Sequence, residues 1–359
     1  MIGGISRSTA RAPHFAGRRE AVFVAAPVAG DAFVVRDLPL AAVDLADWDD
    51  RLSAWGATAR SSAARLLFLR MQNPLARPVR LRALEVTGQT VGYFLLARRK
   101  DAWVFEDGLV LDPAFEHRWA EAMAAALSRL GPGTYVYGNR WITKPSRAAC
   151  IAALAGVSEV TVDEYLIDFI DFRQWSSWDD YYRCVGSNSK LNEKRALRVN
   201  PDLQFNDFGG RLIPMTALQL ARLRRETYRR KNIPFRPLRG LVLPTLKRAV
   251  NVLGKKVFVA RSAGRAEAAM ELVEFGRTTE YRSGGANLGA AGSSWALMFN
   301  VLRRAYERHP SGKFVMGWRG AAAKESDGGL IRSRRAVRAE ELRSAVVRFH
   351  YGGRRAQDA

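Results

Sequence analysis

The sequence contains the same run of predicted elements twice, and this repeat limits what the chain can fold into more than any other feature. Three short stretches that are apolar or alternate with polar residues are followed by a loop, a helix and a further strand, first over residues 79–137 and again over residues 256–318. The equivalent hairpin turns fall at Gly88 and Gly264, 176 residues apart. Period-two alternation predicts strands, and apolar residues three and four apart predict helices. We therefore expect two copies of one α/β unit, with chance similarity of short β runs as the alternative.

Length and composition fit two globular domains. The chain has 359 residues, of which 48% are hydrophobic, which suffices for a sizeable core and argues against a mainly disordered chain. No apolar run approaches the roughly 20 residues needed to span a bilayer. The two cysteines, Cys150 and Cys184, are too few for a disulfide framework or a metal cluster. We therefore expect a protein of the reducing cytoplasm without a metal site.

Positive charge is concentrated in the second half of the chain. Residues 1–200 carry 26 Lys and Arg against 22 Asp and Glu, whereas residues 201–359 carry 31 against 13, which accounts for most of the net charge of +22. Such a field favours anionic partners, namely the phosphates of a cofactor, a nucleic acid or acidic lipid headgroups. The alternative is an arginine-rich composition with solvated basic faces, and charge alone does not choose among these.

A loop of small residues is the most informative segment. Residues 284–294, GGANLGAAGSS, join the third strand of the second copy to a helix with an apolar stripe that includes Trp295 and Phe299. Small residues let a ligand approach the backbone closely, and the first N–H groups of a helix have no partner within the helix. The pattern predicts a diphosphate cradle, with a flexible loop as the alternative. In the first copy the equivalent loop has one glycine and Asp112, whose carboxylate repels an anion, so we expect that copy to have lost the site.

These elements resemble a known family. Three strands, a small-residue loop, a helix and a splayed next strand are similar to the acyl-CoA-binding core of the GNAT N-acyltransferases. Residues 185–198, VGSNSKLNEKRALR, resemble the basic helix motif of a two-domain GNAT group. That group includes the cellulose-biosynthesis-type acetyltransferases and the Fem-type aminoacyltransferases that build peptidoglycan bridges. The sequence departs from the group at Glu193, where an apolar residue is usual, and lacks the Phe of the C-terminal Gly-Leu-x-x-Phe-Lys segment.

The resemblance implies both a fold and an activity. The implied fold class is α/β (α+β), with tandem GNAT-like domains that each contain a mixed, mostly antiparallel sheet flanked by helices. We expect an N-terminal arm over residues 1–40, a degenerate GNAT-like domain over 41–172 and a GNAT-like domain that binds the acyl donor over 173–359. The implied activity is transfer of an acyl group, with acetyl as the first expectation, from acyl-CoA to an amine. The amine would attack directly with general-base assistance, and no metal would take part.

The same resemblance assigns candidate site residues. The residues expected to bind acyl-CoA are Ser283, Gly284, Gly289, Ala290, Ala291, Gly292, Ser293 and Ser294. The candidate general bases are Glu280, Tyr281 and Glu271. Because Glu280 and Tyr281 are neighbours on a strand they point to opposite faces, so only one can meet the substrate, and we prefer Glu280. The alternatives are that Glu280 is paired with Arg277 or Arg282 and that Tyr281 belongs to the core.

The basic helix has two interpretations, and two other functions stay open. A contact with an anionic substrate and a solvated basic face are both compatible with Lys190, Lys194, Arg195 and Arg198. The expected acceptor is a small-molecule, glycan or peptide amine. The first alternative function is a Fem-type aminoacyltransferase that uses aminoacyl-tRNA, which makes tRNA a partner. The second is a non-enzymatic basic protein that binds anions or nucleic acid on a GNAT scaffold.

Overall fold

One sheet runs through both halves of the molecule. The computed structural model describes residues 32–71, 79–208, 214–230, 242, 254–287, 292–322 and 328–352. The strands up to residue 171 are β1 (Val34–Asp37), β2 (Val79–Val86), β3 (Gln89–Arg99), β4 (Ala102–Phe105), β5 (Val110–Leu111), β6 (Gly133–Tyr137) and β7 (Val157–Asp171). The later strands are β8 (Gln204–Phe208), β9 (Lys255–Ser262), β10 (Arg265–Phe275), β11 (Thr278–Ala286), β12 (Lys313–Gly320) and β13 (Glu340–Tyr351). In the described residues they form a 13-stranded sheet in the order β1-β2-β3-β4-β6-β13-β7-β12-β11-β10-β9-β8, with β5 paired to β3.

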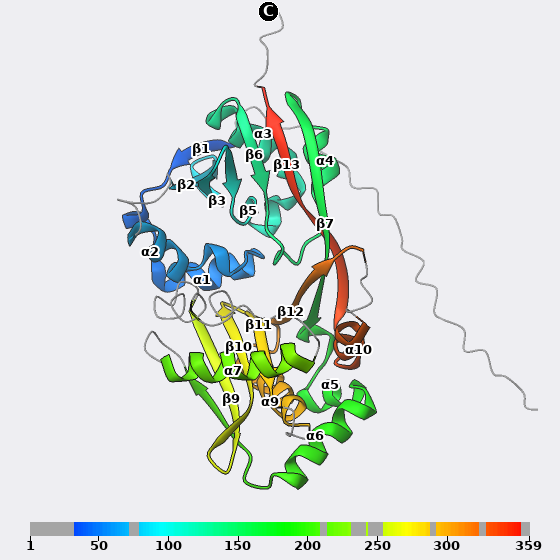
Figure 1. Ribbon diagram of the computed structural model, residues 1–359. Helices are drawn as coiled ribbons and strands as arrows, with labels where there is room; N and C mark the ends of the chain where they lie inside the picture. The colour runs from blue at the N-terminus through cyan, green and yellow to red at the C-terminus, as the bar shows by residue number, and fades with distance from the viewer. Residues whose placement is uncertain are drawn as a thin grey trace, which may run out of the picture.

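Helices cover both faces of each half of the sheet. The helices before residue 175 are η1 (Leu40–Ala42), α1 (Leu45–Ala54), η2 (Ala59–Ser61), α2 (Ala63–Met71), η3 (Pro113–Arg118), α3 (Trp119–Leu130), α4 (Ala148–Ala152) and η4 (Phe172–Gln174). The later ones are α5 (Trp178–Cys184), α6 (Ser187–Val199), α7 (Pro214–Arg230), α9 (Ser293–Arg308) and α10 (Gly328–Ala336). In the lower half of Figure 1, α7 lies across one face of β9, β10 and β11, and α9 lies behind the same strands. Separate apolar clusters form on the two faces, one around Leu220 and Leu223 of α7 and one around Leu297 and Leu302 of α9.

A single strand pair joins the two halves. The last strand, β13, lies between β6 and β7 and is antiparallel to both, with a β7 ladder from Glu340↔Phe169 to Tyr351↔Val157. The C-terminal part of β7 also pairs with β12, from Lys313↔Asp171 to Gly320↔Tyr165. Figure 1 shows β7 and β13 running from the upper half of the molecule into the lower half. If a domain boundary is placed near residue 172, directly after β7, then β13 belongs to the second domain and pairs with β6 in the sheet of the first half.

The predicted hairpins are confirmed, and both depend on positive φ angles. Thr87 and Gly88 have φ of 50° and 81°, and Ala263 and Gly264 have φ of 47° and 75°. Two consecutive residues with positive φ define the two-residue turns whose twist matches that of the flanking strands. The repeat seen in the sequence is therefore carried by equivalent tight hairpins, β2–β3 and β9–β10.

Two predicted helices are each broken in the structure. Apolar residues three and four apart predict one helix over residues 44–70, but α1 ends at Ala54, because Gly56 has φ of 81° and the Thr58 side chain then caps η2. The sequence also predicts one helix over residues 178–199, but this segment divides into α5 and α6, because the N–H of Gly186 donates to the carbonyl of Ala336 across the fold. Sequence periodicity alone misses both breaks, since one depends on a single backbone angle and the other on a contact 150 residues away in sequence.

Several predicted features lie outside the described residues. They are the N-terminal arm up to residue 31, nearly all of the expected helix over residues 239–253, and Gly289, Ala290 and Ala291 of the small-residue loop. None of the described helices is long and apolar enough to cross a membrane.

We expect the return of β13 to stabilise the first half of the sheet. Phe349 of β13 is fully buried and stacks on Tyr135 of β6, with ring centroids 5.8 Å apart. Replacement of Phe349 by Ala leaves a cavity and should lower the free energy of unfolding by about 3–5 kcal/mol, measured by urea denaturation. The control is Val162→Ala on β7, where the side chain is 42% exposed. Equal effects of the two substitutions would contradict this account of β13.

Candidate active site

The strands β11 and β12 pair over only three residues and then separate. They are parallel from Thr278↔Lys313 to Glu280↔Val315, and no pairing follows. A bulge at Arg282 interrupts the pairing of β11 with β10, and a second irregularity at Met316 interrupts the pairing of β12 with β7. A bulge bends its strand and raises the local twist, so each strand turns away from the other beyond Glu280. The splayed strand expected from the resemblance is thus present in the second half.

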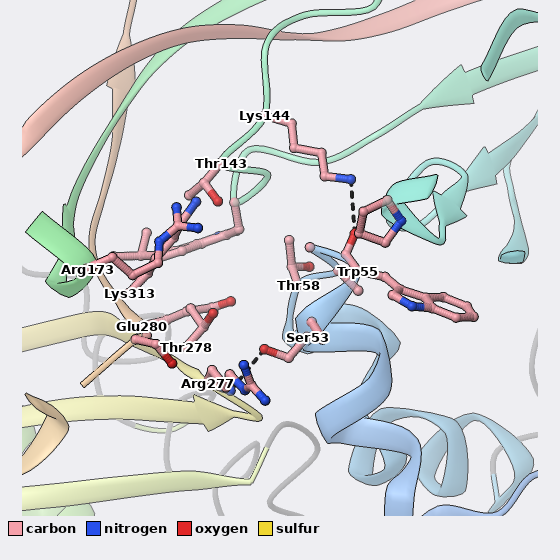
Figure 2. A pocket seen from close by; sticks show the side chains of 18 of the residues that line it. Ser53, Trp55, Thr58, Thr143, Lys144, Arg173, Arg277, Thr278, Glu280 and Lys313 are labelled. Carbon is pink, nitrogen blue, oxygen red and sulfur yellow. Dashed lines mark hydrogen bonds between the residues drawn. The ribbon is translucent and has the colours of Figure 1, made fainter. Parts of the chain in front are cut away.

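Two cavities lie beside the point where these strands part. The first, here called the splay cavity, has a volume of about 280 Å³ and is lined by residues of β10, β11, β12, α7, α9 and α10. The second, here called the central cavity, has a volume of about 520 Å³ and lies between α1 of the first half and β11 and β12 of the second. Figure 2 shows the central cavity, with Ser53 and Trp55 on one side and Glu280 and Lys313 on the other.

Adjacent residues on each strand divide between the two cavities. Glu280 and Val315 line the central cavity, whereas the next residues along, Tyr281 and Met316, line the splay cavity. Successive residues of a strand point to opposite faces, as the sequence predicted for Glu280 and Tyr281. The two cavities therefore approach the same gap in the sheet from its two sides.

The glycines of β11 make room for the protein's own elements. A Cβ atom on Gly285 would lie 2.5 Å from the backbone N of Arg224 in α7, and one on Gly284 would lie 2.4 Å from Oη of Tyr281. Both residues also line the splay cavity. At Gly292, which has φ of 77°, a Cβ would lie 2.2 Å from the carbonyl oxygen of Asn192 in α6. The small residues thus permit close packing of α6 and α7 around the cavity, a role that the loop sequence did not reveal.

The start of α9 has polar groups to offer a ligand. No described side chain caps this helix, so its first N–H groups keep the partial positive charge of a helix N-terminus. Ser294 lines the splay cavity, and Ser293 is fully buried with an Oγ atom that has no hydrogen-bond partner among the described residues. The Oγ atom of Ser283 on β11 is buried and unpartnered in the same way.

In the first half a tyrosine fills the equivalent gap. The strands β4 and β6 also pair in parallel, up to Phe105↔Tyr137. Beyond that point the hydroxyl of Tyr137 accepts hydrogen bonds from the N–H of Leu109 at 3.2 Å and from Nε1 of Trp119 at 2.9 Å. Burial raises the pKa of Tyr137 to about 12, so the hydroxyl stays neutral.

Glu280 is a buried carboxylate held from both halves of the molecule. Its side chain is 1% exposed and forms an ion pair with Arg282, while the N–H of Ala59 in η2 donates to Oε1 at 3.3 Å. Burial raises the pKa of Glu280, and the positive charge of Arg282 partly opposes the rise. Arg282 in turn lies over the ring of Trp141, 3.6 Å from its centroid. The pairing with Arg282 considered in the sequence analysis is therefore present, and Glu280 also lines a cavity.

The other two candidate bases are placed differently. Tyr281 faces the splay cavity, and burial raises its pKa. Glu271 is 5% exposed, forms an ion pair with Lys255 at 2.8 Å and lines neither cavity. Of the three, Glu280 alone faces the cavity between the halves.

Cations outnumber carboxylates around the central cavity. Its lining includes Lys144, Arg173, Arg277 and Lys313, against Glu116 and Glu280. Lys144 donates to the carbonyl of Trp55 at 3.0 Å and contacts Glu116 at 3.3 Å, as Figure 2 shows in part. Lys313 lies 5.1 Å from the ring centroid of Phe169, and burial lowers its pKa. No sequence motif marks this group of cations, because its members come from four separate segments of the chain.

The basic helix does not reach either cavity. Lys190 is half-buried and donates to the carbonyl of Arg183 at 3.1 Å, at the end of α5. Lys194, Arg195 and Arg198 are exposed on α6. None of the four lines the splay cavity or the central cavity. The structure therefore separates these residues from the gap between β11 and β12.

A buried aspartate organises the segment that touches Glu280. Asp107 accepts hydrogen bonds from the N–H of Thr58 at 2.6 Å, the hydroxyl of Thr58 at 2.5 Å and the hydroxyl of Ser61 at 2.9 Å. The side-chain amide of Asn139 donates to it at 2.7 Å. Burial raises the pKa of Asp107 to about 6 despite these donors. Asp107 thus fixes η2, whose Ala59 N–H contacts Glu280.

Within the described part of the chain, no group of three or more His, Cys, Asp and Glu side chains is arranged to hold a metal ion. The polar groups at the gap are carboxylate, guanidinium, hydroxyl and backbone amide. Such groups bind anions and move protons.

Comparison with known proteins supports the fold. No protein-family model matches the chain, and no curated protein matches it in sequence. Among solved structures, FemX is similar with a TM-score of 0.62 at 9% identity, over 86% of this chain and 96% of that one. A conserved protein of unknown function from Bacteroides thetaiotaomicron gives a TM-score of 0.51 at 13% identity, over 86% of this chain and 98% of that one. The likeness to FemX extends over both halves and confirms the expected class, a tandem GNAT-like α/β fold.

The environment of Asp107 predicts a pH-dependent stability. Because burial raises the pKa of Asp107 in the folded state above the ordinary value of an aspartate, ionisation of Asp107 destabilises the fold. Its contribution to the free energy of unfolding should be fully present below about pH 4 and fall by about 3 kcal/mol as the pH rises through about 6. Urea denaturation of the wild type and of Asp107→Asn across this pH range gives the difference between their free energies of unfolding. A difference that does not change with pH would show that Asp107 is not protonated in this window.

Proposed function

We propose that this protein is an N-acyltransferase that moves an acyl group, acetyl in the simplest case, from acyl-CoA to an amine. One observation supports the proposal most: neighbouring residues on β11, and likewise on β12, line two different cavities. A donor in one cavity and an acceptor in the other would meet at the gap after Glu280 and Val315. Direct transfer requires this arrangement, because two ligands must be held with their reacting atoms in contact.

The splay cavity suits the donor. Its walls include the apolar side chains of Met270 and Met316, which suit a pantetheine arm, and the start of α9, where no described side chain forms a cap, offers N–H groups to a pyrophosphate. The backbone around the bulge at Arg282 would align the thioester. In this arrangement Gly284 and Ser294, which line the cavity, would lie along the donor, with Ser283 and Ser293 next to them in the chain.

The central cavity suits the acceptor. A neutral amine would enter from this side and attack the thioester carbonyl, forming the C–N bond while the C–S bond breaks and the thiolate leaves. Glu280 would accept the proton of the amine, directly or through a water molecule. A carboxylate with a raised pKa is a better proton acceptor near neutral pH than an exposed one. The surrounding cations favour an acceptor that carries negative charge.

A second candidate is a Fem-type aminoacyltransferase, in which the ester of an aminoacyl-tRNA replaces the thioester. The observation that favours it is the likeness to FemX over 96% of that chain. The same gap and the same Glu280 would serve, because an amine attacks an activated carbonyl in both reactions. The basic second half would supply the phosphate contacts, and binding would weaken steeply with salt. Retention of aminoacyl-tRNA without retention of CoA would favour this candidate.

Acyl-CoA should stabilise the protein through the splay cavity. A ligand that binds only the folded state raises the melting temperature, so acetyl-CoA and CoA should both raise it. Ser294→Trp should abolish the shift, because the indole would fill the cavity beside the start of α9. The matched control is Ser187→Trp, which changes an exposed serine at the start of α6. A shift that survives Ser294→Trp would place CoA elsewhere, and no shift in the wild type would remove acyl-CoA as the donor.

Glu280→Gln tests the proton acceptor. Glutamine keeps an oxygen for Ala59 N–H but cannot take a proton, so kcat should fall by about 10²–10⁴-fold while the thermal shift with CoA is kept. The control is Glu274→Gln on β10, a half-buried carboxylate paired with Lys256 and outside both cavities. An unchanged kcat in Glu280→Gln would mean that Glu280 only neutralises Arg282.

A further inference from the structure

The outward surface of α6 combines aliphatic and basic side chains. Leu191 is 62% exposed and Val199 is 55% exposed, and Leu197 is 44% exposed at the edge of the same surface. Residues three and four apart lie side by side on a helix, so Lys194, Arg195 and Arg198 surround Leu191. We call this surface the α6 face; it consists of Leu191, Lys194, Arg195, Leu197, Arg198 and Val199.

The α6 face carries no negative charge, because the one acidic residue of the helix points inward. Glu193 accepts a hydrogen bond from the hydroxyl of Tyr182 and is half-buried. Among the described residues, no ion pair is formed by Lys194, Arg195 or Arg198.

The helix that presents this face is firmly held. Ala196 is fully buried on the opposite side, and the carbonyl of Asn192 packs against Gly292 at the start of α9. Lys190 ties the first turn of α6 to the last carbonyls of α5. In Figure 1, α6 forms the lower end of the molecule, away from the first half. The exposed side chains therefore stand on a fixed, outward-facing helix.

We propose that the α6 face binds the surface of an anionic lipid bilayer. Aliphatic side chains ringed by Lys and Arg match the interface of such a membrane, where the apolar groups enter the headgroup region and the cations meet the phosphates. A nucleic acid would satisfy the cations and leave Leu191, Leu197 and Val199 in water, so it fits the face less well. The strongly basic second half adds attraction of the same sign. This proposal is independent of the proposed transferase reaction.

Vesicle sedimentation tests the proposal with the whole chain of 359 residues. The wild type should sediment with vesicles of phosphatidylcholine and phosphatidylglycerol in equal parts, and should stay in solution with phosphatidylcholine alone. Lys194→Gln/Arg195→Gln/Arg198→Gln should lower the partition coefficient at low salt on the order of a hundredfold, since each cation near the surface contributes separately. Leu191→Ser/Leu197→Ser should lower it by about tenfold, including at high salt where the charge contribution is screened.

Matched variants separate the α6 face from the general positive field. Arg222→Gln/Arg225→Gln removes two exposed cations of α7, and Val34→Ser removes an exposed aliphatic side chain of the first half. The α7 variant should lose far less binding than the α6 cation variant, and Val34→Ser should bind vesicles like the wild type. An equal loss in the α7 variant, or full binding by the leucine variant, would overturn the proposal. Salt-sensitive binding to single-stranded RNA without binding to vesicles would overturn it in favour of a nucleic-acid surface.

Discussion

The ladder between β7 and β13 is the interaction on which the arrangement of the two halves depends. β13 pairs with β7 along its whole length, while β6 and β12 pair with the outer edges of these two strands. The halves therefore share a sheet instead of being joined by a linker. Because a hydrogen-bonded sheet resists rotation of its strands, η2 of the first half is held against Glu280 of the second, and the central cavity keeps its walls.

The same architecture differs between the two halves at the point where its parallel strands part. In both, two parallel strands pair briefly and then separate. In the first half the hydroxyl of Tyr137 accepts a hydrogen bond from the N–H of Leu109 beyond this point, whereas in the second half bulges at Arg282 and Met316 bend the strands beside the splay cavity. The first half also supplies one wall of the central cavity and the network around Asp107.

Much of the fold could be predicted from local patterns, and parts of the site could as well. The alternation in 79–97 and 256–275 fixed the hairpins, and the neighbouring positions of Glu280 and Tyr281 predicted that they face opposite sides. The break at Gly186 and the cations around the central cavity were not predictable in this way. Gly186 bonds to Ala336, and Lys144, Arg277 and Lys313 meet only through folding, so no spacing along the chain marks them.

The sequence by itself determined the repeated β-β-β-loop-α-β order, the two-residue turns and the basic character of the second half, because these depend on neighbouring residues and on composition. Only the tertiary structure decided that β13 returns between β6 and β7, that α6 turns its basic residues away from the gap, and that Glu280 meets the first half. The physical reason is that such contacts join residues up to 221 positions apart, where close packing and buried hydrogen bonds select the partner.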